Sequence, residues 1–180
     1  MLPLRPATPA DVPRLRALID RSVRALGVGY YTAAQIESAL KHVFGPDTQL
    51  IADGTYLVIE SDAGELAAAG GWSRRRTLYG GDQMKSAADP LLDPTTEPAR
   101  IRAFYVHPDW ARRGLARRLF ERGAADAARA GFRSMELMAT LPGEPLYRAL
   151  GFAPIERTTA ELPDGEQLAL VRMTRPIPVG

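Results

Sequence analysis

The chain has 180 residues, of which 46% are hydrophobic and 24% are charged, and its formal net charge at pH 7 is +2. This composition predicts a single globular domain, residues 1–180, and the charge is too small to indicate a nucleic-acid partner by itself. The absence of cysteine excludes disulfides, a thiol nucleophile and cysteine-based metal sites. The two histidines, His42 and His107, are far apart along the chain, so we expect no metal site.

The first half of the chain predicts two helices and three strands. The N-terminus lacks the positive region and unbroken apolar core of a signal peptide or membrane span, so we expect a cytoplasmic protein with no membrane partner. Apolar residues recur at helical spacing from Pro13 to Gly27, and a capping box of Thr32 and Gln35 begins a second helix. The predicted elements are a strand at 2–8, helices at 13–27 and 32–45, and strands at 55–60 and 66–75.

The second half of the chain follows a long connection. Residues 79–98 are rich in glycine, proline and polar residues, and a connection of this length in a small domain is either functional or mobile. The predicted elements after it are a strand at 99–107, a long helix ending near Ala130, a strand at 133–140, a short helix at 144–150 and a closing hairpin at 152–175. The predicted order is therefore β-α-α-β-β-β-α-β-α-β-β.

The stretch HPDWARRGLARRL, residues 107–119, places arginines at the start of the long helix. A helix N-terminus already carries the positive end of the helix dipole, so each arginine in the first turn costs roughly 0.3–1 kcal/mol. A bound polyphosphate would offset this cost, because free N–H groups and guanidinium groups both bind it. Arg112 and Arg113, together with Gly114, which admits phosphate oxygens to the backbone, therefore favour an anion site.

Two other interpretations of these arginines stay open at this point. Arg117 and Arg118 fit a solvated helix face equally well, with Glu121 placed to pair with either of them. A nucleic-acid-binding domain would use the whole cluster. Aromatic residues are not interleaved with the arginines, however, and the net charge is low, so we expect no nucleic-acid partner.

The segment FYVHPDWARRGLARRLF, residues 104–120, resembles motif A of the GCN5-related N-acetyltransferase (GNAT) family. In that family a strand ends in V-x-P. The following loop, Gln/Arg-x-x-Gly-x-Gly/Ala, holds the pyrophosphate of acetyl-coenzyme A (acetyl-CoA) before a helix begins. Val106, Pro108, Gly114 and Ala116 follow this pattern.

A second segment, EPLYRALGF, resembles the end of motif B of the same family, x-Y-x-x-x-G-F. Tyr147, Gly151 and Phe152 occupy the three defined positions. Two positions depart from the family pattern. Ala111 stands where glutamine or arginine is usual, so the role of that side chain is not carried over, and Arg112 or Arg113 would have to compensate. Thr140 stands where the family often has asparagine.

The resemblance covers nearly the whole chain and implies an α/β (α+β) fold. It implies a central mixed, mostly antiparallel sheet of six to seven strands, flanked by about four helices and splayed at the acetyl-CoA site. The implied activity is transfer of an acetyl group from acetyl-CoA to an amine of a small molecule or peptide, by direct attack in a ternary complex. The alternative is a catalytically inactive coenzyme A-binding sensor or interaction module, which the departures at Ala111 and Thr140 keep open.

The resemblance also implies roles for individual residues. Backbone groups of residues 103–106 would hold the pantetheine arm, and the N–H near Val106 would polarise the thioester carbonyl. Tyr147 would be the general acid, since a phenol with a pKa near 10 can protonate a leaving thiolate whose pKa is near 8.5. The alternative for Tyr147 is a core aromatic residue. The residues implied to contact acetyl-CoA are Phe104, Tyr105, Val106, Arg112, Arg113, Gly114, Leu115, Ala116, Arg117 and Thr140.

The sequence leaves the general base and the acceptor site undefined. Candidates for the base are Glu60, Glu37 and His107, and a water chain or the free-amine fraction would serve equally well. The acceptor site is expected at the first two helices and the 79–98 connection. Aromatic residues nearby fit either a small-amine pocket or the core, and they are Tyr30, Tyr31 and Trp72. The oligomeric state also stays open, with a homodimer as one option.

Overall fold

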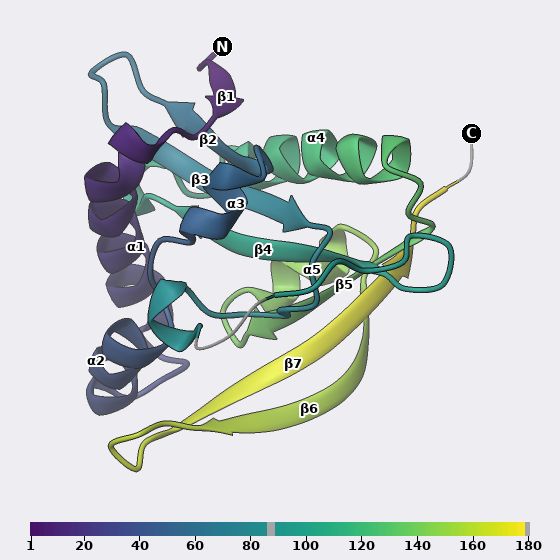
Figure 1. The fold of residues 1–180 in the computed structure, drawn as a ribbon. Coiled ribbons are helices and arrows are strands. Elements are labelled where there is room, and N and C mark those ends of the chain that lie inside the picture. The colour runs from purple at the N-terminus through teal and green to yellow at the C-terminus, as the bar shows by residue number, and fades with distance from the viewer. Residues whose placement is uncertain (86–88, 179–180) are drawn as a thin grey trace.

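The fold is described by a computed structural model that covers residues 1–85 and 89–178. Within these residues seven strands and five α-helices follow one another in nearly the predicted order (Figure 1). The helices are α1 (Val12–Gly27), α2 (Ala33–His42), α3 (Thr48–Ala52), α4 (Leu115–Arg129) and α5 (Glu144–Ala149). The strands are β1 (Leu4–Pro6), β2 (Tyr56–Glu60), β3 (Leu66–Ser73), β4 (Ala99–Val106), β5 (Ser134–Thr140), β6 (Ala153–Glu161) and β7 (Gln167–Pro176).

All seven strands form one sheet in the order β1-β2-β3-β4-β5-β7-β6. Neighbouring strands are antiparallel except for the central pair, β4 and β5, which are parallel. This mixed, mostly antiparallel sheet confirms the predicted fold class. α4 lies along one face of the sheet, whereas α1 and α2 lie on the other side (Figure 1). The domain is therefore built of a central sheet with helices on both faces.

Alternation along the strands divides the core between the two faces of the sheet. The face under α4 and α5 buries a cluster that includes Trp72, Phe120 and Phe152. The opposite face buries a second cluster in which Leu15 and Leu18 of α1 pack against Tyr56 of β2. These two layers hold β4 between them, and β4 therefore offers one set of side chains to each face.

Two details of the predicted elements are wrong. α3 was not predicted; it is a single short turn that Asp47 caps by accepting hydrogen bonds from the N–H groups of Gln49 (3.1 Å) and Leu50 (3.2 Å). α2 ends at His42 and not at Gly45, because Val43 leaves the helical region with φ of −124°. The connection at 79–98, expected to be either functional or mobile, contains a short 3-10 turn, Asp82–Met84, and buries Leu92.

A buried ion pair fastens this connection to the sheet. Arg102 of β4 donates to Asp47 Oδ2 at 2.8 Å, and both side chains are almost completely buried. The same guanidinium donates to the carbonyls of Thr77 (3.0 Å) and Gly80 (2.6 Å), and Lys85 also contacts Asp47. Burial lowers the pKa of Arg102, and the Asp47 carboxylate opposes that effect. Residues 77–85 are therefore held against β4 and α3. Residues 86–88 of the connection lie outside the described part of the chain.

No helix in residues 1–85 or 89–178 combines the length and apolar character needed to span a lipid bilayer.

Candidate active site

β4 and β5 form a gap in the middle of the sheet. In the described structure the two strands pair through Ala99 with Met135 and Arg100 with Glu136, and the ladder goes no further. The buried Glu136 carboxylate contacts both Arg100 and Arg172, which fixes the closed end of the gap. Beyond this point the facing edges of β4 and β5 separate, so backbone groups there are not paired between the two strands and can pair with a ligand. This opening confirms the predicted splay.

A bulge in β4 lies beside the open end of the gap. Ala69 pairs with Tyr105 and Gly71 with Arg102, so two residues of β4 stand opposite Gly70. Ala103, one of these two, has a positive φ of 56°, and its carbonyl accepts a hydrogen bond from the Tyr56 hydroxyl at 3.2 Å. A Cβ at Gly70 would lie 2.7 Å from the ring of Phe104, so glycine is needed there. The bulge thus changes the direction of the last residues of β4, which lie beside the gap.

The loop before α4 presents a row of free backbone N–H groups. The first amide of the helix to find a backbone acceptor is that of Arg118, which donates to the Gly114 carbonyl at 3.1 Å. The N–H groups of residues 112–117 have no backbone acceptor in the described structure. Arg112 and Gly114 adopt left-handed conformations, with φ of 63° and 76°, and the space beside Gly114 is open to at least 4 Å. Such a loop at a helix N-terminus binds anions.

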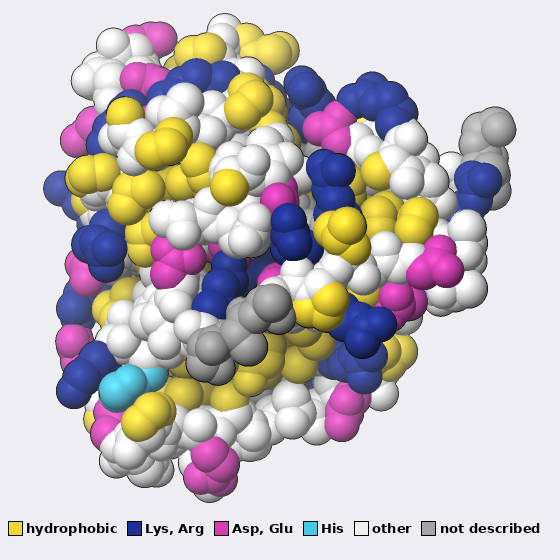
Figure 2. Space-filling view, viewed as in Figure 1, with side chains coloured by type: hydrophobic (Ala, Val, Ile, Leu, Met, Phe, Trp, Pro, Cys, Tyr) yellow, Lys and Arg dark blue, Asp and Glu magenta, His cyan; other side chains and the backbone are white. Residues whose placement is uncertain are grey.

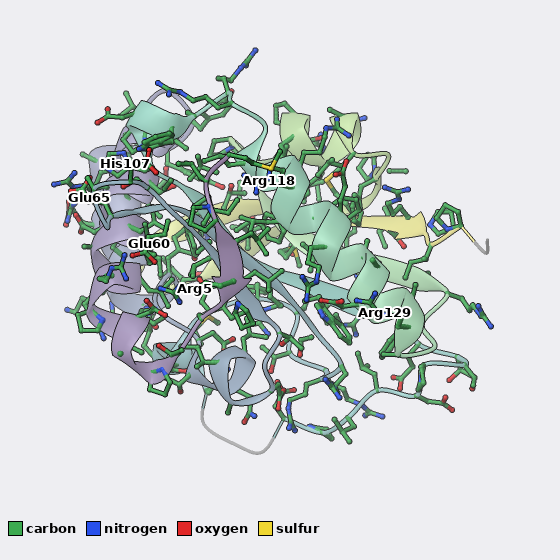
Figure 3. All side chains as sticks on the ribbon, turned by 90° about the horizontal axis from the view of Figure 1, so that it is seen from above. Arg5, Glu60, Glu65, His107, Arg118 and Arg129 are labelled. Carbon is green, nitrogen blue, oxygen red and sulfur yellow. The ribbon has the colours of Figure 1, made fainter. Side chains whose placement is uncertain are left out.

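The arginines around this loop divide into two groups. Arg112, Arg113 and Arg117 are exposed, and the Arg113 guanidinium lies 4.9 Å from the centre of the Trp110 ring. Arg118 instead donates to the Leu2 carbonyl at 2.9 Å and so fastens the N-terminal segment to α4 (Figure 3). The pairing of Arg117 or Arg118 with Glu121 is wrong, since neither makes an ion pair with it in the described structure. Arg112 and Arg113 are therefore available to an anion at this loop, and Arg117 is exposed beside them while it also donates to the Ala149 carbonyl at 3.5 Å.

Tyr147 lies next to the open end of the gap. Its ring packs edge-on against Phe104 of β4 at 6.3 Å and against Phe152 at 5.9 Å. Burial raises the pKa of its hydroxyl above the ordinary value near 10. Among the described residues this hydroxyl has no hydrogen-bond partner. Thr140, at the end of β5, accepts a hydrogen bond from the Gly143 N–H at 3.2 Å. The structure thus brings Phe104, Thr140 and Tyr147 to the same gap.

The three aromatic residues proposed for the acceptor side have different surroundings. Tyr30 is 51% exposed beside α1. Tyr31 donates to the Ala169 carbonyl at 2.7 Å and accepts from the Leu141 N–H at 2.9 Å, and burial raises its pKa to about 12. Trp72 is 3% exposed and packs edge-on against Phe132 at 6.0 Å, under α4. Trp72 is therefore a core residue and not part of an acceptor pocket, which decides between the two alternatives that the sequence left open for it.

A hydrophobic surface lies on the side of the sheet where the acceptor site was expected. Figure 2 shows hydrophobic side chains between α2 and the β6–β7 hairpin, below the residues drawn in grey. The partly buried residues that pack against the core in this region are Tyr31, Phe44, Tyr79, Met138 and Ala160. This surface lies on the face of the sheet opposite to α4, and it offers apolar contacts to a ligand that approaches the gap from that side.

The three candidates for a general base are all engaged elsewhere. Glu60 is bound by Arg5 at 2.9 Å and by Arg14, and these hydrogen bonds lower its pKa (Figure 3). The Glu37 pKa is likewise lowered by its hydrogen bond with Arg24. His107 is buried and lies 2.9 Å from a guanidinium nitrogen of α1. The two carboxylates are therefore weak bases, and the His107 ring is in contact with a guanidinium of α1.

One residue at the gap was missed by sequence reasoning. The N–H of Val106, expected to polarise the thioester carbonyl, donates to the side-chain oxygen of Ser22 at 3.2 Å. Ser22 belongs to α1 and is 4% exposed. It falls on the buried helical stripe of Leu15, Leu18 and Ile19, and a hydroxyl on such a stripe is a signal that the sequence does contain.

Comparison with known proteins agrees with this geometry. The family model described as "Acetyltransferase (GNAT) domain" matches residues 52–154, which is more than half of the chain. The chain belongs to the GNAT family. The matched segment runs from the end of α3 to the start of β6, so it contains the β4–β5 gap, the loop before α4 and Tyr147. The GNAT domain identifies the protein as an acetyl-CoA-dependent acyltransferase.

Solved GNAT structures share the fold over the whole chain. A GCN5-related N-acetyltransferase from Rhodopseudomonas palustris has a TM-score of 0.71 at 21% identity, covering 98% of this chain and 96% of that one. Phosphinothricin acetyltransferase from Sinorhizobium meliloti, in complex with acetyl-CoA, has a TM-score of 0.60 at 18% identity (99% and 90% covered). The ribosomal-protein-S18-alanine N-acetyltransferase from Escherichia coli has a TM-score of 0.60 at 17% identity (100% and 96% covered). No curated protein matches the chain.

Proposed function

We propose that this GNAT protein is an N-acetyltransferase that moves the acetyl group of acetyl-CoA to an amine by direct attack in a ternary complex. The observation that carries the proposal is the joint placement of the β4–β5 gap and the anion loop. The gap ends where β4 ends at Val106, and the loop follows at residues 111–114. An extended thioester arm and a pyrophosphate, linked in one molecule, fit these two neighbouring features.

The chain supplies two kinds of contact to acetyl-CoA in this proposal. Backbone groups of residues 103–106 pair with the pantetheine arm, with Phe104 and Tyr105 forming that part of the strand. The free N–H groups of residues 112–117 hold the pyrophosphate, and Arg112, Arg113 and Arg117 neutralise its charge. The small side chain of Ala116 and the bare backbone of Gly114 leave room for the phosphate oxygens.

Tyr147 supplies the proton for the departing thiolate in this proposal. The amine nitrogen forms a bond to the acetyl carbon, the carbon–sulfur bond breaks, and the phenol proton passes to sulfur. Its pKa is raised by burial, so the phenol keeps its proton at neutral pH. A higher pKa also makes it a weaker acid, and a thiolate leaves without full protonation. Tyr147 therefore accelerates the reaction without being indispensable to it.

The proposed acceptor is an amine carried by a small molecule or by a peptide. The hydrophobic surface between α2 and the β6–β7 hairpin favours an acceptor with an apolar part. The names of the related enzymes include both a small molecule, phosphinothricin, and a protein alanine. We propose that Tyr30 and Tyr31 lie at the entrance for this acceptor, Tyr31 through its ring because its hydroxyl is bound to Ala169 and Leu141.

Thiol release from acetyl-CoA, measured against a panel of amines, amino acids and lysine peptides, tests the function. Amine-dependent release that matches the amount of acetylated product supports the transferase. The alternative function is a coenzyme A-binding module without catalysis, which the departures at Ala111 and Thr140 favour. That alternative predicts tight acetyl-CoA binding without thiol release for any amine in the panel.

Replacing Tyr147 by phenylalanine is expected to lower kcat by about 10²-fold, the lower end of the usual range for a general acid. The ring and its packing against Phe104 and Phe152 are kept, so the affinity for acetyl-CoA should change little. A proton donor used as the carbon–sulfur bond breaks affects kcat and kcat/KM together. The measurement is steady-state kinetics where chemistry limits the rate, with the acetyl-CoA affinity as internal control. Wild-type turnover in this variant would make Tyr147 a core aromatic residue.

A further inference from the structure

Ser22 is placed between α1 and the end of β4. Its side-chain oxygen accepts the hydrogen bond of the Val106 N–H at 3.2 Å, although the two residues are 84 positions apart. The neighbouring Arg21 lies 2.9 Å from His107 Nε2, which ties the same turn of α1 to the same end of β4. Ser22 is 4% exposed, so this contact is made inside the protein.

The direction of the Val106 N–H places Ser22 at the gap. Successive N–H groups of a strand point to opposite edges. The His107 N–H points toward β3, where it donates to the Ala67 carbonyl at 2.9 Å. The Val106 N–H therefore points to the other edge of β4, the edge that faces the β4–β5 gap. The Ser22 oxygen consequently lies where a thioester carbonyl in the gap would meet this strand.

The Ser22 hydroxyl also has a proton to donate. Serine within a helix often donates to the carbonyl four residues earlier. No such bond is formed in the described structure, where Ser22 Oγ accepts from Val106 and donates to no described acceptor. A hydroxyl that accepts one hydrogen bond becomes a stronger donor of the next, because the two bonds polarise each other. Ser22 is thus a buried, oriented hydroxyl with its proton unused.

We propose that Ser22 donates a hydrogen bond to the carbonyl oxygen of the acetyl thioester, and that the Val106 N–H acts on that oxygen through the serine hydroxyl. This inference rests on the proposed acetyl transfer. The serine proton stays on Ser22 throughout. Negative charge grows on the carbonyl oxygen as the amine attacks, and the hydrogen bond from Ser22 strengthens as it does so. The extra amine proton leaves to water, and the thiolate is protonated by Tyr147.

The opposite role is a steric one, in which the Ser22 oxygen occupies the carbonyl position and must move before acetyl-CoA binds. The two roles predict opposite effects of Ser22→Ala. If Ser22 donates, the variant loses turnover. If Ser22 obstructs, the Val106 N–H becomes free, and the variant binds acetyl-CoA more tightly or reacts faster.

The first experiment compares Ser22→Ala with Ser38→Ala. Ser38 is a matched control: it is 3% exposed, lies in α2 and donates to Asp164 at 2.6 Å, away from the gap. Losing one preorganised oxyanion donor typically lowers kcat by about 10²–10³-fold. We expect a loss of about 10- to 100-fold for Ser22→Ala, because the Val106 N–H can then reach the carbonyl directly. Ser38→Ala should affect the free energy of unfolding while kcat stays near the wild-type value.

The second experiment measures the carbonyl directly. S-acetonyl-CoA, a ketone analogue that cannot transfer its acyl group, is bound to each protein and its carbonyl stretching frequency is recorded by infrared difference spectroscopy. A hydrogen bond lowers this frequency. The frequency in the wild-type protein should therefore lie below that in Ser22→Ala, and Ser38→Ala should match the wild type. Equal frequencies in wild type and Ser22→Ala overturn the proposal, as does unchanged or faster turnover in Ser22→Ala.

The two experiments separate this inference from the proposed function. A wild-type protein that releases no thiol with any amine refutes the acetyl transfer, whereas the infrared shift still reports whether Ser22 contacts the carbonyl. A wild-type protein that turns over normally, with a Ser22→Ala variant equal to it in both readouts, refutes the Ser22 contact alone.

Discussion

Gly114→Glu is expected to abolish the rise in melting temperature that acetyl-CoA gives the wild-type protein. A ligand that binds the folded state alone stabilises it by RT ln(1 + L/Kd) at free ligand concentration L, so the melting temperature rises more for a tighter ligand. The glutamate side chain would fill the open space beside Gly114, among the free N–H groups of residues 112–117, and its charge would repel a pyrophosphate. The measurement is the melting temperature with and without saturating acetyl-CoA.

A matched control separates this loss of binding from backbone strain. Gly114 has φ of 76°, a conformation in which any other residue is strained by about 1–2 kcal/mol. Gly165, in the turn between β6 and β7, has φ of 87° and equally open surroundings. Gly165→Glu should lower the melting temperature to a similar extent and keep the full response to acetyl-CoA. A folded Gly114→Glu protein that still shows the wild-type response would place the anion elsewhere.

Asp47→Ala is expected to lower the free energy of unfolding by about 3–5 kcal/mol, the usual result of leaving a buried ion without its partner. The side chains of Asp47 and Arg102 are 1% and 2% exposed, and they meet at 2.8 Å. Arg102 cannot reach water from this position, and its carbonyl partners do not neutralise its charge. The loss of the α3 cap acts in the same direction. Urea unfolding, followed by circular dichroism, measures the change.

Two further variants define the cause of that loss. Asp20→Ala removes a surface ion pair in which Asp20 is 50% exposed and Arg24 is 45% exposed. This variant should change the free energy of unfolding far less. Combining Asp47→Ala with Arg102→Met removes the stranded charge and should recover part of the loss, because the partner that made Asp47 necessary is gone. A single variant Asp47→Ala as stable as Asp20→Ala would mean that water or a rearranged side chain solvates Arg102.

Features set by local sequence were predicted well. The capping box of Thr32 and Gln35, the turn at Gly114 and the order of strands and helices each depend on residues a few positions apart. The loop geometry of HPDWARRGLARRL, with its unpaired N–H groups before α4, belongs to the same class. A left-handed glycine followed by a helix is a short-range pattern, and the free N–H groups follow from it directly.

Features set by contacts across the sheet were not predicted. The bond between Ser22 and Val106 spans 84 positions, and that between Asp47 and Arg102 spans 55. The sequence could not decide between core and acceptor pocket for Trp72, because the face to which a strand residue points depends on its register with neighbouring strands. The predicted pair of Arg118 with Glu121 is absent for a similar reason: Arg118 donates instead to the carbonyl of Leu2, which is distant in sequence.

The two edge strands of the sheet, β1 and β6, are poorly suited to pair with another strand. β1 is three residues long and contains Pro6. β6 begins near Pro154, has an irregular register before Glu156, and carries the charges of Arg157 and Glu161. Short strands, proline, bulges and charges all hinder the addition of another strand at an edge. An extended ligand therefore pairs more readily with the backbone at the β4–β5 gap than with β1 or β6 at the edges of the sheet. Self-association by strand pairing at these edges is disfavoured.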